Sequence, residues 1–131
     1  MPIGAFIVDD QADVRLLVRM IIEAANNGLF VSGEAASGQE AVDRLEETDP
    51  AVVVVDEMMP GLSGIETAVL MLRRRPGQRI ILCSAHLDDS LIQRANAAGI
   101  HVCLTKEQAR EIPGAIRALV GEPPAPSRQG P

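Results

Sequence analysis

The chain has 131 residues, a length that fits one domain with a single hydrophobic core. Hydrophobic residues make up 47% of the chain and charged residues 23%, which excludes a chain that is disordered throughout. The net charge of −6 argues against direct binding of nucleic acid, and no apolar run reaches the length of a membrane span.

The N-terminus and the cysteines indicate a cytoplasmic protein. The segment MPIGAFIVDD has no basic residues before its apolar run, so we expect no signal peptide. Cys83 and Cys103 are the only cysteines, and in a reducing compartment we expect buried thiols, not a disulfide. The spacings Cys83-x-x-His86 and His101-x-Cys103 match no common zinc motif, so a zinc site is disfavoured.

Strand-like and helix-like segments alternate along the chain. Apolar runs that suit strands occupy residues 3–8, 29–35, 52–55, 79–85 and 100–105. Helical patterns occupy residues 12–25, 39–47, 67–75, 90–98 and 110–120. Five strands that alternate with five helices predict βαβ units and a parallel, doubly wound α/β sheet.

The first two helices carry recognisable signals. The face of the first helix that we expect to be buried has the i, i+3, i+4, i+7 spacing: Leu17, Met20, Ile21 and Ala24. Gly28 follows this helix and stops it. Ser37 with Glu40 predicts a capping box, which opens the second helix.

The later elements are bounded in the same way. Ser63 with Glu66 is a second capping box, and it precedes the third helix. Asp88 or Asp89 caps the fourth helix, and Gly99 ends it. These boundaries support the alternation of strands and helices.

The last ten residues differ from the rest. Residues 122–131 read EPPAPSRQGP, which is proline-rich and offers no apolar residues to bury. We therefore expect a domain over residues 1–121 and a linker or disordered tail over residues 122–131. A linker toward a missing domain and a short disordered C-terminus both fit this composition.

Polar residues follow four of the five expected strands at the point where each strand ends. Asp9 and Asp10 follow the first strand, Asp56 the third and Lys106 the fifth, and Ser84 lies at the end of the fourth. The carboxyl ends of parallel strands meet at one edge of the sheet. Crowded carboxylates need a cation, and hard oxygen ligands suit Mg²⁺. With a lysine and a hydroxyl, the set indicates a phosphoryl-transfer site in which Asp56 is the nucleophile.

These residues, in this order, resemble the response-regulator receiver domain, the phospho-acceptor module of two-component signalling. The resemblance covers about residues 3–120. The matching positions are Asp9 and Asp10, then Asp56 with Met59, Pro60 and Gly64, then Ser84 with Ala85, and finally Lys106. The resemblance implies a flavodoxin-like (βα)5 fold with strand order 2-1-3-4-5.

The resemblance also implies a metal site. Asp10 and Asp56 would bind Mg²⁺ directly, with Mn²⁺ as an alternative ion. The backbone carbonyl of Met58 would be a further ligand, and Asp9 would act mostly through water. Helix caps and loop carboxylates are the plain alternative for such aspartates.

The implied chemistry is phosphorylation of Asp56 by a histidine kinase or a small phosphodonor, with Ser84 and Lys106 holding the phosphoryl oxygens. The segments VSGEAASGQEAV and MPGLSGIE are most similar to receivers that precede a LuxR-type helix-turn-helix output. The resemblance therefore implies a signalling domain, not an enzyme, although it would assist its own phosphorylation and dephosphorylation. Its partners would be the kinase, an output domain absent from this chain that controls transcription, and a second copy after phosphorylation.

Two positions depart from the family pattern. Cys103 stands where the family has Tyr or Phe, and the chain contains no Tyr or Trp. Glu107 stands where proline often follows the lysine. We therefore expect an altered relay from the site to the distant surface, while the phosphorylation chemistry is kept.

Two other functions stay open. A degenerate receiver would bind partners without phosphorylation, and Cys103 favours it slightly. A haloacid-dehalogenase-like phosphatase also has a nucleophilic aspartate after a buried strand. It needs a second carboxylate two residues further on, and this chain has Met58 there.

Overall fold

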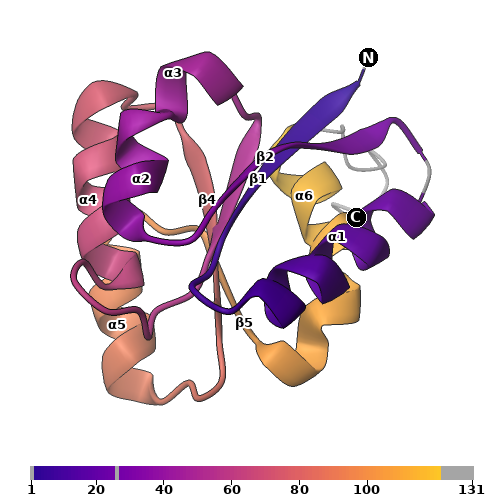
Figure 1. Cartoon of the computed structure of the whole chain (residues 1–131). Coiled ribbons are helices and arrows are strands. Elements are labelled where there is room, and N and C mark those ends of the chain that lie inside the picture. Colours follow the sequence, from indigo (N-terminus) through magenta and orange to yellow (C-terminus); the bar gives the residue numbers. More distant parts are fainter. Residues whose placement is uncertain (1, 26, 122–131) are drawn as a thin grey trace, which may run out of the picture.

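A computed structural model describes residues 2–25 and 27–121 of the chain, so the expected tail at residues 122–131 lies outside the described residues. Five parallel strands form one sheet in the order β2-β1-β3-β4-β5 (Figure 1). The strands are β1 (Ile3–Val8), β2 (Leu29–Ala35), β3 (Val52–Val55), β4 (Arg79–Ser84) and β5 (Val102–Thr105). The predicted flavodoxin-like fold and its strand order are confirmed.

Helices cover both faces of the sheet, as a doubly wound fold requires (Figure 1). One face carries α1 (Ala12–Ala25), the 3₁₀ helix η1 (Lys106–Glu111) and α6 (Ile112–Leu119). The other face carries α2 (Gly38–Asp43), α3 (Leu45–Thr48), α4 (Gly64–Arg74) and α5 (Asp89–Ala98). None of the helices in the described part of the chain has the length and apolar character that a bilayer span requires.

The valines of β3 serve both faces of the sheet. Val53 and Val55 pack into the core cluster on the side of α4, and Val52 and Val54 pack into the cluster on the side of α1. All four are at most 3% exposed. A continuous valine run suits this strand because successive side chains alternate between two buried faces.

Most of the predicted helix ends are confirmed. Ser63 and Glu66 form a reciprocal capping box at the start of α4. The side chain of Asp88 accepts a hydrogen bond from the backbone N–H of Leu91, so Asp88, and not Asp89, caps α5. Gly99 ends α5 with φ of 99°, a left-handed conformation that favours glycine.

The capping box predicted at α2 is only half right. The hydroxyl of Ser37 accepts a hydrogen bond from the backbone N–H of Glu40, as expected. The carboxylate of Glu40 accepts from the N–H of Ala36 instead of Ser37.

The same helix was expected to continue to residue 47, but it breaks at Arg44, where φ is −103° and ψ is 10°. Arg44 donates a 2.6 Å hydrogen bond to the backbone carbonyl of Glu34, a contact across the fold that local sequence does not reveal.

The buried face predicted for α1 is wrong. Val18 and Ile22 are the buried residues, whereas Leu17 and Met20 are 51% and 57% exposed. The apolar band of this helix is wider than the face that the sheet can cover, so periodicity alone does not choose its rotation. The predicted start of the fifth strand is also wrong, because β5 begins at Val102.

Candidate functional site

The register of the two central strands places Asp9 beside Asp56. Val8 pairs with Val55 in the parallel β1–β3 ladder, so the next residue of each strand leaves the sheet at the same level. The N–H of Asp56 donates a 3.0 Å hydrogen bond to the carbonyl of Val8. Both carboxylates are buried, each residue being 4% exposed.

Gly64 allows the chain to turn tightly beside Asp56. A Cβ atom at this position would lie 2.5 Å from the backbone oxygen of Asp56, which is too close for any side chain. The backbone N–H of Gly64 donates to the carbonyl of Glu57, and the Glu57 carboxylate accepts from the N–H of Ile65. The first turn of α4 is therefore fastened directly to the segment that carries Asp56.

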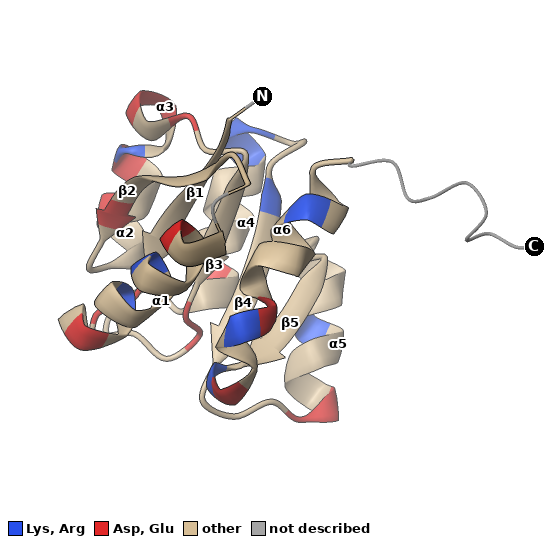
Figure 2. Cartoon of the chain, turned by 90° about the vertical axis from the view of Figure 1, so that its right-hand side faces the viewer, with Lys and Arg blue, Asp and Glu red and all other residues tan. Residues whose placement is uncertain are grey.

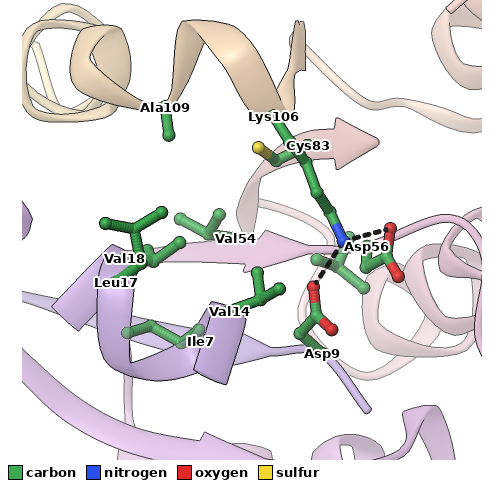
Figure 3. Close-up of a pocket in the computed structure, with 11 residues that line it drawn as sticks. Ile7, Asp9, Val14, Leu17, Val18, Val54, Asp56, Cys83, Lys106 and Ala109 are labelled. Carbon is green, nitrogen blue, oxygen red and sulfur yellow. Dashed lines mark hydrogen bonds and ion pairs between the residues drawn. The ribbon is translucent and has the colours of Figure 1, made fainter. Parts of the chain in front are cut away.

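The side chain of Lys106 extends from the start of η1 to the two buried acidic residues (Figure 3). It is the first residue of η1, which opens with a capping box between Thr105 and Gln108. Its Nζ lies 3.0 Å from Oδ2 of Asp9 and 3.5 Å from Oδ1 of Asp56. The contact with Asp9 is a hydrogen bond, whereas the contact with Asp56 is an ion pair. Oδ1 of Asp56 is buried and receives no hydrogen bond from the described residues.

The electrostatics of the site favour a bound cation. Burial, with the charge of Asp9 as a further cause, raises the pKa of Asp56 above its usual range. Burial alone would lower the pKa of Lys106, but its hydrogen bond to Asp9 and the charges of Asp56 and Asp9 raise it overall. Lys106 therefore stays charged at neutral pH, and one ammonium faces more than one carboxylate.

The carboxylates also have the geometry of a metal site. Oxygen atoms of Asp9, Asp10 and Asp56 all lie within 4.8 Å of one another. Asp10 is exposed, so the cluster opens to solvent on its side. The buried Oδ1 of Asp56 receives no hydrogen bond from the residues that the structure describes, and an oxygen that binds a metal needs none. The residues therefore fit a hard divalent cation.

The two remaining predicted residues are placed less completely. Ser84 is 1% exposed and pairs with Thr105 in the β4–β5 ladder, so it lies on the same edge of the sheet as Lys106. Met58 is 72% exposed, and no hydrogen bond among the described residues involves its backbone carbonyl. The structure thus brings Asp9, Asp10, Asp56 and Lys106 together, and the roles of all six residues stay predictions.

Sequence reasoning missed a small apolar cavity behind the carboxylates (Figure 3). Its volume is about 110 Å³, and Asp9, Asp56 and Lys106 form its polar side. Its apolar walls are Ile7, Val14, Leu17, Val18, Val54, Val55, Cys83 and Ala109. Burial raises the pKa of the Cys83 thiol to about 11, so this group is neutral at physiological pH.

Sequence reasoning also missed Arg15. Its Nη1 donates a 2.6 Å hydrogen bond to the backbone carbonyl of Asp9. An arginine that binds a backbone carbonyl leaves no sequence motif, and only the rotation of α1 brings the two together.

Comparisons with known proteins agree with this geometry. The family model for the response regulator receiver domain matches residues 5–117. The chain is 36% identical over 109 residues to the transcriptional activator protein ExaE of Pseudomonas putida, covering 83% of this chain and 50% of ExaE. It is 38% identical over 93 residues to the chemotaxis protein CheY of Thermotoga maritima, covering 71% of this chain and 76% of CheY.

A solved structure shows the same fold. A two-component response regulator of the LuxR family from Aurantimonas sp. SI85-9A1 superposes with a TM-score of 0.87 at 31% identity, covering 93% of this chain and 87% of that one. The chain spans only half the length of ExaE, so the likeness to ExaE concerns this one domain. With the strand order, the clustered aspartates and the match over residues 5–117, the chain belongs to the response regulator receiver domain family.

Proposed function

We propose that Asp56 accepts a phosphoryl group from a histidine kinase in a reaction that requires Mg²⁺, with Mn²⁺ as an alternative ion. The observation that carries this proposal is the buried Asp56 carboxylate beside Lys106, with an oxygen that receives no hydrogen bond from the described residues. Membership of the receiver family supports it, because receiver domains are signalling domains of two-component systems.

The proposed step is a displacement at phosphorus. An oxygen of Asp56 forms a bond to phosphorus while the P–N bond of the kinase's phosphohistidine breaks. The imidazole leaves with the bonding electron pair and takes up a proton, and Asp56 becomes an acyl phosphate. Lys106 holds a phosphoryl oxygen as a point charge, and Ser84 donates a hydrogen bond from its hydroxyl.

The metal would be held directly by Asp10 and Asp56, mostly through water by Asp9, and by the backbone carbonyl of Met58. It would neutralise negative charge that develops on the transferred group. The buried Asp56 carboxylate then keeps one oxygen for the metal and one for phosphorus. This use of the two oxygens is consistent with the finding that no described residue donates a hydrogen bond to Oδ1.

Intact mass measurement tests the phosphorylation site. Wild-type protein incubated with Mg²⁺ and a small acyl phosphate should gain one phosphoryl group, and Asp56→Asn should gain none. Asp13→Asn removes an exposed carboxylate of α1 and should behave like wild type. Full labelling of Asp56→Asn at another residue would contradict the proposal.

The same experiment separates the alternative functions. Steady release of inorganic phosphate from a phosphate ester, without a stable mass gain, would favour a phosphatase. Absence of any gain with both a small phosphodonor and a phosphorylated kinase would favour a module that binds partners without phosphorylation.

We propose that phosphorylation changes the surface of this domain and thereby controls an output. The name of the relative ExaE, a transcriptional activator protein, supports transcription as that output. Association of two copies after phosphorylation is part of this proposal. Sedimentation velocity with and without phosphodonor tests it, with Asp56→Asn as the control. An unchanged sedimentation coefficient for fully phosphorylated protein would remove dimerisation from the proposal.

A further inference from the structure

The backbone of Asp9 is held on two sides, separately from its carboxylate. Its N–H donates a 3.1 Å hydrogen bond to the carbonyl of Ala35 on β2. Its carbonyl accepts the 2.6 Å hydrogen bond from Nη1 of Arg15 on α1. The carboxylate has other partners, since Oδ1 accepts from the N–H of Gln11 and Oδ2 from Lys106. Arg15 therefore contacts the backbone peptide group of Asp9 and not its carboxylate.

Glu34 fixes the direction of the Arg15 guanidinium. Oε1 of Glu34 lies 3.1 Å from Nε of Arg15, and Oε2 lies 2.7 Å from Nε of Arg19, one turn further along α1. Figure 2 shows the two basic bands in the middle of α1, between acidic ends. The Arg15 side chain is 19% exposed and that of Glu34 is 28% exposed, so these pairs are partly shielded from water. A planar guanidinium held at Nε aims its remaining donors in a fixed direction, here at Asp9.

The peptide group that Arg15 holds is the one that joins Asp9 to Asp10. Because a peptide is planar, fixing its carbonyl also fixes the N and Cα atoms of Asp10. Asp10 is exposed, and among the described residues no hydrogen bond from another side chain holds its carboxylate. The position of that carboxylate, within 4.8 Å of those of Asp9 and Asp56, therefore depends on the backbone.

We propose that Arg15, oriented by Glu34, is a positioning residue that holds the Asp9–Asp10 peptide so that Asp10 presents its carboxylate to the divalent cation. This inference rests on the proposed function, because it concerns the same metal site. Groups that orient metal ligands without touching the metal commonly change affinity by about 10- to 100-fold when they are removed. Arg15 would orient the ligand Asp10 without touching the metal, because it binds the backbone carbonyl of Asp9.

Arg19 provides a matched control. Arg19→Ala removes the same charge from the same helix and also breaks a Glu34 ion pair, but Arg19 makes no hydrogen bond to Asp9 in the described structure. The chain has no Trp or Tyr, so Mg²⁺ binding is measured by isothermal titration calorimetry. We expect Arg15→Ala to weaken Mg²⁺ binding by about 10-fold and Arg19→Ala by less than about 2-fold.

Phosphorylation kinetics separate positioning from a general loss of structure. In Arg15→Ala the Mg²⁺ concentration for half-maximal phosphorylation should rise by about the same 10-fold. The rate at saturating Mg²⁺ should stay near that of wild type, because the nucleophile and Lys106 are untouched. A lower rate at saturation with an unchanged Mg²⁺ midpoint would overturn the proposal.

Ionic strength separates positioning from long-range charge. Between about 0.05 M and about 0.5 M KCl, screening removes most interactions between distant exposed charges. The ratio of Mg²⁺ affinities between wild type and Arg15→Ala should therefore persist at the higher concentration. A ratio that falls to that of Arg19→Ala would assign the effect to charge and overturn the positioning role.

A double-mutant cycle tests the contribution of Glu34. If Glu34 acts through Arg15, Glu34→Ala should add little to the loss of Mg²⁺ affinity in Arg15→Ala. Fully additive losses would overturn the coupling between the two residues. Wild-type affinity in Arg15→Ala would overturn the inference while leaving the proposed function intact, whereas wild-type protein that binds no Mg²⁺ and gains no phosphate would overturn both.

Discussion

Lys106 donates a 3.0 Å hydrogen bond to Asp9, although the two residues lie 97 positions apart in the sequence. The same ammonium lies 3.5 Å from Asp56, so it serves two carboxylates whose side chains are 6% and 4% exposed. Lys106 is also the only lysine in the chain. In the metal-free protein this single cation therefore compensates at most one of the two buried negative charges at the site.

Removal of that cation should destabilise the metal-free protein. We expect Lys106→Met to lower the free energy of unfolding at pH 7 by about 2 kcal/mol, since two buried carboxylates lose their partner. The cost stays below that of a fully buried pair because the Lys106 side chain is 26% exposed. Excess Mg²⁺ should recover part of the loss, because a ligand that binds only the folded state stabilises it.

Urea unfolding in EDTA and in Mg²⁺ measures both parts of this prediction. Arg110→Met removes an exposed cation from the same 3₁₀ helix and should change stability little in either buffer. An equal loss for Lys106→Met in the two buffers would show that the metal and Lys106 do not compensate the same carboxylates.

Gly64→Ala should destabilise the protein by about 1–3 kcal/mol, because the new methyl group would overlap the backbone of Asp56. Helix propensity alone predicts that Gly64→Ala stabilises the protein, since alanine is the better helix former. Gly114→Ala is the matched control: it also lies in a helix, and apart from its chain neighbours and the backbone of its own helix no described atom lies within 4 Å of the added carbon. Urea unfolding should therefore show a loss for the first variant and none for the second.

The sequence predicted those parts of the fold that depend on local chemistry. The valine run, the capping box at Ser63 and the glycine at position 99 each follow from side-chain chemistry within a few residues. The acidic pair, Asp56 and Lys106 could be placed together because each follows a strand, and parallel strands end at one edge of the sheet.

The features that sequence did not predict depend on how elements pack. The rotation of α1 that buries Val18 instead of Leu17 depends on its neighbours across the sheet. The break at Arg44 accompanies a hydrogen bond to Glu34, ten residues away. The Arg15 contact with Asp9 follows from that rotation of α1, so no local pattern could have revealed it.

Burial of Cys83 should make the free energy of unfolding fall as the pH rises through the alkaline range. Its pKa rises from 9.0 to about 11 in the folded protein because burial disfavours the thiolate. Between these values the unfolded chain loses the proton while the folded chain keeps it. The contribution of Cys83 is therefore fully present below pH 9 and is lost as the pH rises toward 11.

The difference in unfolding free energy between wild type and Cys83→Ala isolates this contribution. We expect the advantage of wild type to shrink steadily above pH 9 and to be constant below it. Alkylation at pH 8 should modify the partly exposed Cys103 before Cys83. A difference that stays flat from pH 8 to pH 11 would mean that the Cys83 thiolate is not disfavoured by folding.

We expect Cys103 to limit the conformational change that phosphorylation would cause. It lies opposite Leu82 in the β4–β5 ladder and packs, partly buried, against the core cluster on the side of α4 and α5. A thiol buries far less area than the tyrosine common at this position and has no hydroxyl to exchange partners. Ser84 and Lys106 remain as the groups whose contacts would differ between the two states.

We therefore expect phosphorylation to alter hydrogen exchange mainly in the segment from Ser84 to Asp88 and in α5, with smaller changes in β5 and α6. A switch needs contacts that differ between its states, and those of Ser84 and Lys106 act on the loop after β4. Cys103→Tyr should enlarge the response and extend it into β5. Selective ¹⁵N-lysine labelling adds a single side-chain probe, since Lys106 is the only lysine. The prediction is wrong if β5 and α6 change as strongly as the loop in wild type, or if Cys103→Tyr leaves the pattern and its amplitude unaltered.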